Sequence, residues 1–289
     1  MVFIPGGTFL MGSNAFYREE RPVQRVSTDG FWIDRFPVTN AQFRRFVDAT
    51  GYVTFSERAP TREMYPDAAA EFLVPGSLVF VKPPRPVSLR DYRAWWAYVP
   101  GANWRHPNGP NSSIAHRDNH PVVHVAYEDA SAYAAWAGKA LPGEVEWEYA
   151  ARGGLEGAAY PWGDAANPEG RFMANTWQGR FPFENLAEDG YEGTSPVDAF
   201  PPNGYGLHDM VGNVWEWTST PYASSHDAEK SCCHRETLDQ RSHLQVVKGG
   251  SHLCAPNYCL RFRPAARQGE TRDSSTCHIG FRCIVREPS

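Results

Sequence analysis

The sequence predicts a single α+β domain that is rich in loops and low in regular secondary structure. The chain has 289 residues, enough for a large core, and no charged or Gly/Ser-rich linker divides it. Its 25 glycines, 24 prolines and 10 tryptophans indicate loops held together by aromatic packing, with no long helices. We therefore assign residues 1–289 to one domain built from short strands and short helices.

The composition argues against two classes of partner. The formal net charge is −5 and no basic run is present, so no nucleic-acid partner is expected. No apolar stretch approaches the length of a transmembrane helix, so no membrane partner is expected either. The N-terminus lacks the basic and apolar regions of a signal peptide, and six cysteines are too few for a disulfide scaffold. These features predict a reducing, cytoplasmic compartment.

Short strands and one capped helix are expected in the N-terminal part of the chain. Residues 1–12 form two apolar runs around a Pro-Gly-Gly turn, a hairpin pattern, and residues 31–33 resemble a third strand. A helix begins near Thr39, where Gln42 completes a capping box, and Gly51 is expected to end it.

An irregular, proline-rich insertion in the domain follows at about residues 56–95. Beyond it, residues 120–125 (HPVVHV) predict a strand, in which the two histidines would lie about 13 Å apart, an arrangement that disfavours a metal site. Two short helices follow, from about Glu128 to Ala137 and from about Gly143 to Arg152, each ending at glycine. The second carries three glutamates, interpreted as a solvated face and first-turn charges: Glu144, Glu146 and Glu148.

The most informative stretch runs from residue 248 to residue 283 and holds four of the six cysteines. Cys254 and Cys259 are five positions apart, so neither a helix nor a strand would bring their sulfurs together. The intervening Pro256-Asn257 favours a turn that could make both thiols converge. Two converging thiolates suit Cu(I), but they could equally form a disulfide, half of a zinc site or a buried structural pair. Cys232-Cys233 stays unassigned.

Two polar stretches place oxygen ligands in turn-like sequence. The first contains Asn175-Thr176 and then Glu188-Asp189-Gly190-Tyr191, and the second is DMVGNVWEW at residues 209–217. Ca²⁺ takes six to eight oxygens, many of them backbone carbonyls on a turning loop. The pattern is not an EF-hand, and ordinary turns followed by an aromatic strand explain it as well.

Taken together, five segments of the sequence resemble the formylglycine-generating enzymes, the sulfatase-modifying family. They are IPGGTFLMGS at 4–13, WAGKALPGEVEWEYAARGG at 136–154, YPWGD at 160–164, NGYGLHDMVGNVWEW at 203–217 and KGGSHLCAPNYCLRFRPAAR at 248–267. The opening and the GNVWEW run mark a broad superfamily, whereas GGSxxCxxxxCxRxRxAAR, present at 249–267, is specific to the true enzymes.

The resemblance implies a fold related to C-type lectin-like domains and a copper-dependent oxidase. Its substrate would be an unfolded sulfatase polypeptide containing CxPxR, whose cysteine is oxidised to Cα-formylglycine with O₂ and a thiol reductant. The implied cofactors are Cu(I) and two structural Ca²⁺ ions. The implied site residues are Cys254 and Cys259 for Cu(I), Ser251 and Trp215 beside it, Arg263 and Arg267 at or beneath the substrate groove, Asn175, Thr176, Asp189 and Tyr191 for one calcium ion, and Asp209, Gly212, Val214 and Glu216 for the other.

The sequence departs from the family pattern at four places, most of all in the insertion at about residues 56–95, to which no substrate contact is assigned. Ala134 stands where secreted members have a cysteine that pairs with the equivalent of Cys283, so Cys283 should be a free thiol. Gly143 replaces a threonine at a helix start, which should weaken that cap. Cys277-His278 replaces a polar pair near the active site, and the effect of this extra thiol is open.

Two rival functions are distinguished by sequence features. A non-catalytic paralogue that binds sulfatases or carbohydrate would lack the cysteine pair, which is present here. A related non-haem iron enzyme would need three clustered histidines, usually on an additional helical domain, and the chain has neither. The oxidase hypothesis is therefore preferred.

Overall fold

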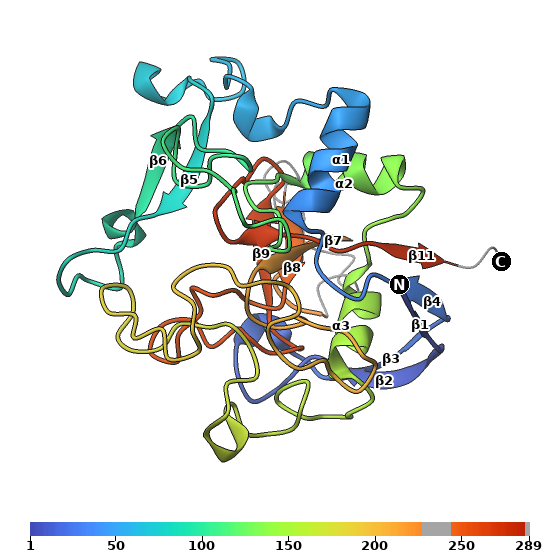
Figure 1. The fold of residues 1–289 in the computed structure, drawn as a ribbon. Helices are drawn as coiled ribbons and strands as arrows, with labels where there is room; N and C mark the ends of the chain where they lie inside the picture. The colour runs from blue at the N-terminus through green and yellow to red at the C-terminus, as the bar shows by residue number, and fades with distance from the viewer. Residues whose placement is uncertain (227–243, 287–289) are drawn as a thin grey trace, which may run out of the picture.

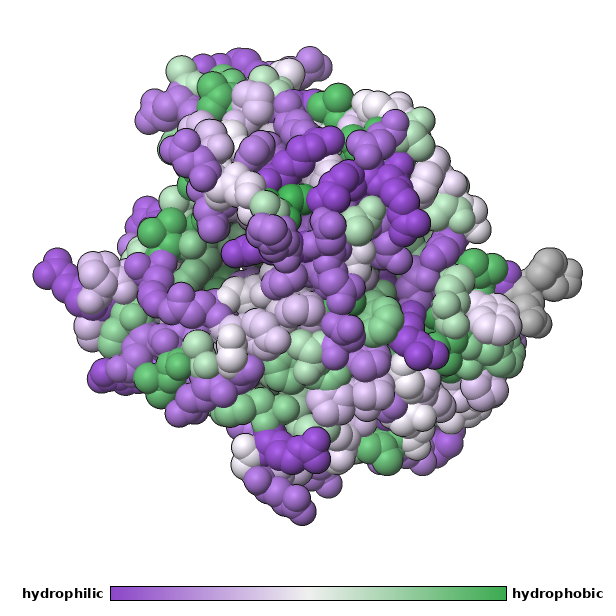
Figure 2. Space-filling view, in the orientation of Figure 1, coloured by the Kyte–Doolittle hydropathy of each residue, from purple (hydrophilic) through white to green (hydrophobic). Residues whose placement is uncertain are grey.

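The computed structural model describes residues 1–226 and 244–286, and it shows short helices and four small sheets joined by long loops (Figure 1). Cys232 and Cys233 lie outside these residues. In the described part of the chain, no helix is long and apolar enough to cross a membrane. The visible face is mostly hydrophilic, with smaller hydrophobic patches between charged and polar residues (Figure 2).

The N-terminal strands contribute to two sheets, one of which also contains the last described strand. Strands β1 (Val2–Ile4), β4 (Phe31–Ile33) and β11 (Ile284–Arg286) form an antiparallel sheet with β4 in the centre. Strand β2 (Gly7–Met11) pairs with β3 (Gln24–Thr28). The expected hairpin within residues 1–12 is therefore wrong, because its two strands pair with segments further along the chain.

The central sheet has the order β10-β7-β8-β9. Strands β7 (Trp215–Pro221), β8 (Leu244–Lys248) and β9 (Arg267–Thr271) are antiparallel neighbours, and the short β10 (Ile279–Gly280) runs parallel to β7. The loop between β8 and β9 carries both Cys254 and Cys259.

Helix α1 (Asn40–Thr50) confirms the capping-box prediction. Thr39 and Gln42 exchange both capping hydrogen bonds, and Gly51 ends the helix at φ 67°. Helices α2 (Tyr127–Trp136) and α3 (Glu144–Arg152) also begin and end within a residue of their expected bounds. The short 3₁₀ segments are Arg18–Glu20, Phe55–Glu57, Ala70–Phe72, Tyr92–Ala94 and Pro168–Gly170.

Two segments differ from the sequence-based expectation. Residues 120–125 form no strand: Pro121 makes an isolated bridge to Thr39, and His124 takes φ 60°. The insertion is less irregular than expected, since strand β5 (Gly76–Phe80) lies inside it and pairs with β6 (Trp96–Pro100). An aromatic cluster below this pair, formed by Trp95, Trp177 and Phe181, packs on Leu253 and Ala255 of the cysteine loop.

Candidate active site

The cysteine loop is closed at its base by paired strands. Lys248 of β8 lies opposite Arg267 of β9, and the chain between them turns at once through Gly249 (φ 92°) and Gly250 (φ 70°). A Cβ at position 250 would lie 2.8 Å from the carbonyl oxygen of Arg261. Only glycine fits both this close approach and the left-handed backbone, so the small-residue turn sets how the loop folds back.

The two thiols converge, as the Pro-Asn turn predicted. The sulfurs of Cys254 and Cys259 lie 2.9 Å apart, whereas a disulfide bond would require about 2.05 Å. The turn is closed by the Cys259 N–H, which donates to the carbonyl of Ala255 at 2.8 Å. The two cysteines are therefore free of a disulfide bond, and their sulfurs are in direct contact.

The two sulfurs differ in electrostatic environment. Burial raises the pKa of Cys254 well above the usual value of a thiol. The hydrogen bond from Cys254, together with the positive charge of Arg261, lowers the pKa of Cys259 to about 7. The geometry thus favours a proton on Cys254 and a thiolate on Cys259, and thiolate is the form that binds soft metals.

A second segment, far away in sequence, holds the chain just after Cys259. We call residues 16–20 the N-terminal clamp. The hydroxyl of Tyr17 accepts the Leu260 N–H at 3.0 Å, and the Arg261 guanidinium lies 3.9 Å above the ring of Tyr17 and donates to Glu19 at 2.6 Å. The next arginine, Arg263, lies 3.6 Å above the ring of Phe16. Sequence analysis missed this clamp because its partners are more than 240 positions apart.

Arg263 and Arg267 lie beneath the loop. Arg263 is 1 % exposed and its Nη1 donates to Glu20 at 2.9 Å. Arg267 is 3 % exposed and makes paired hydrogen bonds of 2.8 and 2.7 Å to Glu144. Both guanidinium groups are therefore taken up by buried carboxylates, and their place relative to a substrate groove stays a prediction.

The interpretation of the α3 glutamates as a solvated face is wrong. Glu144 and Glu148 are 3 % and 0 % exposed, and both contact the buried Lys248 ammonium, at 3.4 and 2.9 Å. Burial opposes ionisation of Glu148, but Lys248 and Arg152 outweigh it and lower its pKa to about 2. Arg152 is four positions from Glu148 on the same helix, but Lys248 comes from a strand about a hundred positions away, and a helix pattern could not reveal it. Of the three glutamates, only Glu146 approaches the expected surface position, paired with the half-exposed Arg286.

Gly143 lacks a capping side chain, and the structure supplies one from another element. The Thr220 hydroxyl of β7 accepts the Glu144 N–H at 2.9 Å, and the Glu146 carboxylate accepts the Gly143 N–H at 2.6 Å. The helix start is therefore capped from outside.

Ser251 and Trp215 are both buried near the thiols. The Ser251 hydroxyl accepts the Leu253 N–H at 3.2 Å, and its carbonyl accepts the Cys254 N–H at 2.9 Å. Trp215 is 2 % exposed and belongs to the same core cluster as Cys254. Both residues therefore belong to the buried surroundings of the cysteine loop.

The other described cysteines are separate thiols. Cys283 is free and buried, as predicted, and lies in the same core cluster as Ala134; burial raises its pKa. Cys277 is also free, its sulfur accepts the Phe80 N–H at 3.2 Å, and burial raises its pKa to about 12.

Comparison with known proteins identifies the family. The model of the sulfatase-modifying factor enzyme 1-like domain matches residues 1–287. The formylglycine-generating enzyme of Mycobacterium tuberculosis is 54 % identical over 99 % of this chain and 97 % of its own. The chain belongs to the sulfatase-modifying family.

Two further relatives define the range of this family. The mouse protein named inactive Cα-formylglycine-generating enzyme 2 is 41 % identical over 98 % of this chain and 84 % of its own. The structure of PvdO from Pseudomonas aeruginosa superposes with a TM-score of 0.66 at 26 % identity, covering 98 % of this chain and 92 % of that one. The sulfatase-modifying fold therefore spans active and inactive proteins, and activity must be argued from the cysteine loop.

The first expected calcium site has oxygen groups that suit a cation, although the Gln178 amide donates to the Thr176 carbonyl and to the Asp189 carboxylate. Asn175 is fully buried, and its Oδ1 has no hydrogen-bond partner, while its Nδ2 donates to the Gly193 carbonyl at 2.8 Å. Asp189 accepts the N–H groups of Thr176 at 3.2 Å and Tyr191 at 3.0 Å, so these three residues lie together. Burial raises the pKa of Asp189, as expected for a carboxylate that lacks a counter-charge.

The second expected calcium site fits only in part. Asp209 Oδ1 is buried without a partner, and burial raises the pKa of Asp209 to about 7. Gly212 and Val214 are also buried, on either side of Asn213. Glu216, however, is already bound: Arg282 donates to both of its oxygens, at 2.7 and 2.8 Å, and Trp147 Nε1 donates at 2.7 Å. This guanidinium would repel a cation, so Glu216 is a poor ligand in this arrangement.

Asn213 is a structural residue that sequence analysis missed. Its side chain bonds both backbone groups of Ser195 and donates to Asp209 at 2.7 Å, while its carbonyl accepts from His252. It takes φ 54°, a conformation that asparagine tolerates. It therefore links the second calcium-site segment to the cysteine loop.

Proposed function

We propose that this protein is a formylglycine-generating enzyme, which converts a cysteine of an unfolded sulfatase polypeptide to Cα-formylglycine. The observation that carries the proposal is the convergence of Cys254 and Cys259 at 2.9 Å on a loop with the sequence of the true enzymes. The high identity to enzymes of that name over nearly the whole chain supports it.

Cys254 and Cys259 would hold Cu(I), which suits two soft thiolates and would supply the one-electron and O₂ chemistry. The protein's own groups prepare the site for it. Arg261 stabilises the Cys259 thiolate, and the Cys254 proton must leave when both sulfurs become ligands. The buried side chains of Ser251 and Trp215 would help to exclude bulk water from the reacting sulfur.

The electron balance requires a further reactant. Oxidation of a thiol to an aldehyde with release of sulfide removes two electrons from the substrate, whereas full reduction of O₂ to water takes four. A thiol reductant would supply the other two and become a disulfide. A cytoplasmic location, which is part of the proposal, would provide such thiols.

A non-catalytic paralogue is the second candidate, because an inactive relative shares the fold. The retained, converging cysteine pair favours the enzyme. In addition, no group of three His, Cys, Asp or Glu side chains suited to a metal occurs in residues 1–226 and 244–286, which gives no support to the iron-enzyme alternative.

We also propose that Asn175, Thr176, Asp189 and Tyr191 bind a structural Ca²⁺ and that Asp209, with the carbonyls of Gly212 and Val214, binds a second.

Mass spectrometry of a synthetic CxPxR peptide, incubated in air with the reduced, Cu(I)-loaded protein, tests the activity. The expected product is lighter by about 18 Da, since one oxygen replaces one sulfur and two hydrogens, and a hydrazide traps its aldehyde. Cys254→Ala and Cys259→Ala should each abolish conversion while remaining folded, whereas Cys283→Ala should retain it. An unchanged peptide, with one Cu(I) bound per chain, would instead identify a copper-binding relative without the activity.

A further inference from the structure

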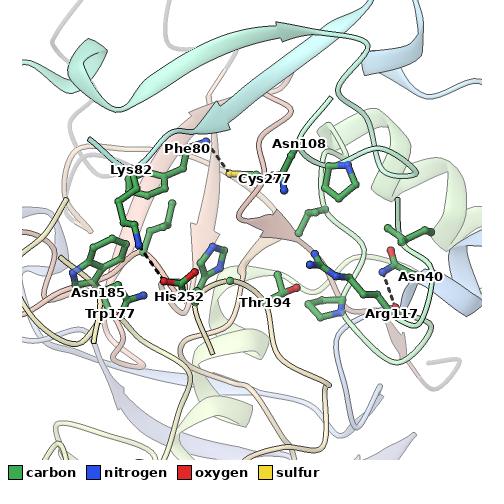
Figure 3. Close-up of a pocket in the computed structure, with 17 residues that line it drawn as sticks. Asn40, Phe80, Lys82, Asn108, Arg117, Trp177, Asn185, Thr194, His252 and Cys277 are labelled. Atoms are coloured by element: carbon green, nitrogen blue, oxygen red, sulfur yellow. Dashed lines mark hydrogen bonds and ion pairs between the residues drawn. The ribbon is translucent and has the colours of Figure 1, made fainter. Parts of the chain in front are cut away.

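A polar cavity of about 320 Å³ adjoins the cysteine loop, and neither copper nor calcium binding uses it. Its wall includes Leu253, next to Cys254, together with Trp177 and three asparagines, Asn40, Asn108 and Asn185 (Figure 3). We propose that this amide cavity binds the main chain of the substrate polypeptide beside the reacting cysteine. This inference rests on the proposed function, because it names how that same site holds an unfolded substrate.

Two residues that line the amide cavity each have a buried polar atom without a partner. Asn40 is 3 % exposed, and its Oδ1 accepts no hydrogen bond although its Nδ2 donates to the Arg117 carbonyl at 2.9 Å. Trp177 is 2 % exposed, and its Nε1–H has no acceptor. An unmatched buried donor or acceptor costs about 1–3 kcal/mol, so the cavity favours a ligand that offers both kinds of group.

The cavity is also lined by the ion pair of Lys82 and Glu192 and by Arg117, and two further asparagines add amide groups to it. The Asn108 side chain is exposed and makes no hydrogen bond within the described part of the chain. Asn185 uses its Oδ1 to accept the Ala187 N–H at 3.0 Å, which leaves its amide N–H groups for a ligand. A peptide backbone presents alternating donors and acceptors of this kind. Amide side chains can bind them whatever the substrate's side chains are.

The wall of the cavity is bonded to the cysteine loop, although neither cysteine lines the cavity itself. The Trp177 backbone N–H donates to the Cys254 carbonyl at 3.0 Å, so the cavity wall and the reactive loop are fixed to each other. The Trp177 ring lies 5.1 Å from that of Phe181, which stacks at 4.6 Å on Tyr258, the neighbour of Cys259. An extended chain that brings its cysteine to the thiols would therefore pass the amide cavity within a few residues.

Peptides of different length distinguish binding in the amide cavity from an indirect effect of a substitution on the thiols. We would compare a short CxPxR peptide with two longer ones, extended by six residues on the N-terminal or the C-terminal side. Asn108→Ala should raise KM about 5-fold for one extended peptide, the loss of one hydrogen bond of about 1 kcal/mol, with kcat unchanged. N-methylation of the backbone amides in that extension should raise KM in the wild type and abolish the effect of the substitution. The matched control is Asn111→Ala, an exposed asparagine outside the cavity.

Binding assays keep this test independent of turnover. Peptides with serine in place of the cysteine would be titrated calorimetrically into the copper-free protein. If the wild type binds an extended peptide more tightly than the short one, and Asn108→Ala removes that advantage, the inference stands even where no peptide is converted. If length, N-methylation and the substitution change neither KM nor affinity, the cavity binds only water and the inference is wrong.

Discussion

The buried pair of Glu20 and Arg263 should be a major determinant of stability. Their side chains are 0 % and 1 % exposed, and two hydrogen bonds join the carboxylate to the guanidinium. Glu20→Gln keeps the shape of the side chain but removes its charge, so Arg263 remains buried without a counter-charge. Breaking a buried ion pair in this way costs about 3–5 kcal/mol.

Equilibrium unfolding in urea measures this cost. Asp118→Asn is the matched control, since it removes one carboxylate from the pair with Arg44, whose side chains are 64 % and 40 % exposed. The control should lose less than about 1 kcal/mol of unfolding free energy, because water screens an exposed pair. Glu20→Gln should lose several times more, with an unchanged denaturant slope.

A double variant tests the physical reason for the loss. In Glu20→Leu/Arg263→Met neither charge remains, so much of the stability lost by Glu20→Gln should return. If Glu20→Gln matched the exposed control, or if the double variant were as unstable as the single one, the uncompensated charge would not be the cause. The clamp would then act through the packing of Phe16 and Tyr17.

Three further outcomes follow from the structure. The folded pKa of Glu148 is about 2, below its ordinary value of 4.5. Its ionised carboxylate therefore contributes about 3 kcal/mol to the free energy of unfolding above pH 4.5, and this contribution is lost as the pH falls towards 2. The stability of Glu148→Gln should accordingly fall less steeply than that of the wild type across this pH interval. Thr220→Val removes the external cap of α3 and should lower the unfolding free energy by about 1 kcal/mol, whereas Thr220→Ser should not. A calcium chelator should lower the thermal midpoint of the wild type by more than that of Asp189→Asn, which retains only the second proposed site; equal shifts in both would contradict the first calcium site.

Features set by neighbouring residues, such as helix ends, could be predicted from the sequence, whereas strand pairings between distant segments could not. The start and end of α1 follow from Thr39, Gln42 and Gly51, which act within a few residues of one another. The hairpin expected in residues 1–12 failed because β1 pairs with β4, a choice that local pattern does not encode. The strand expected at 120–125 failed for a similar reason: that backbone bonds to Val38 and Thr276.

The candidate site shows the same division. The Pro256-Asn257 turn indicated that the thiols converge, and the family motif indicated what they would bind. Burial of Glu144 and Glu148 was not foreseeable, because Lys248 and Arg267 become their partners only through the β8–β9 pairing. Asn213 gave no signal, since an asparagine in a glycine-rich turn has many roles.

The closed base of the cysteine loop means that the fold does not depend on the two residues that would carry the chemistry. Lys248 and Arg267 face each other across two strands and share Glu144, so the base is held together without either thiol. A lineage could therefore lose Cys254 or Cys259 and keep the scaffold, then free to diverge towards binding. The coexistence of active and inactive proteins on one fold is the evolutionary pattern that such an arrangement permits.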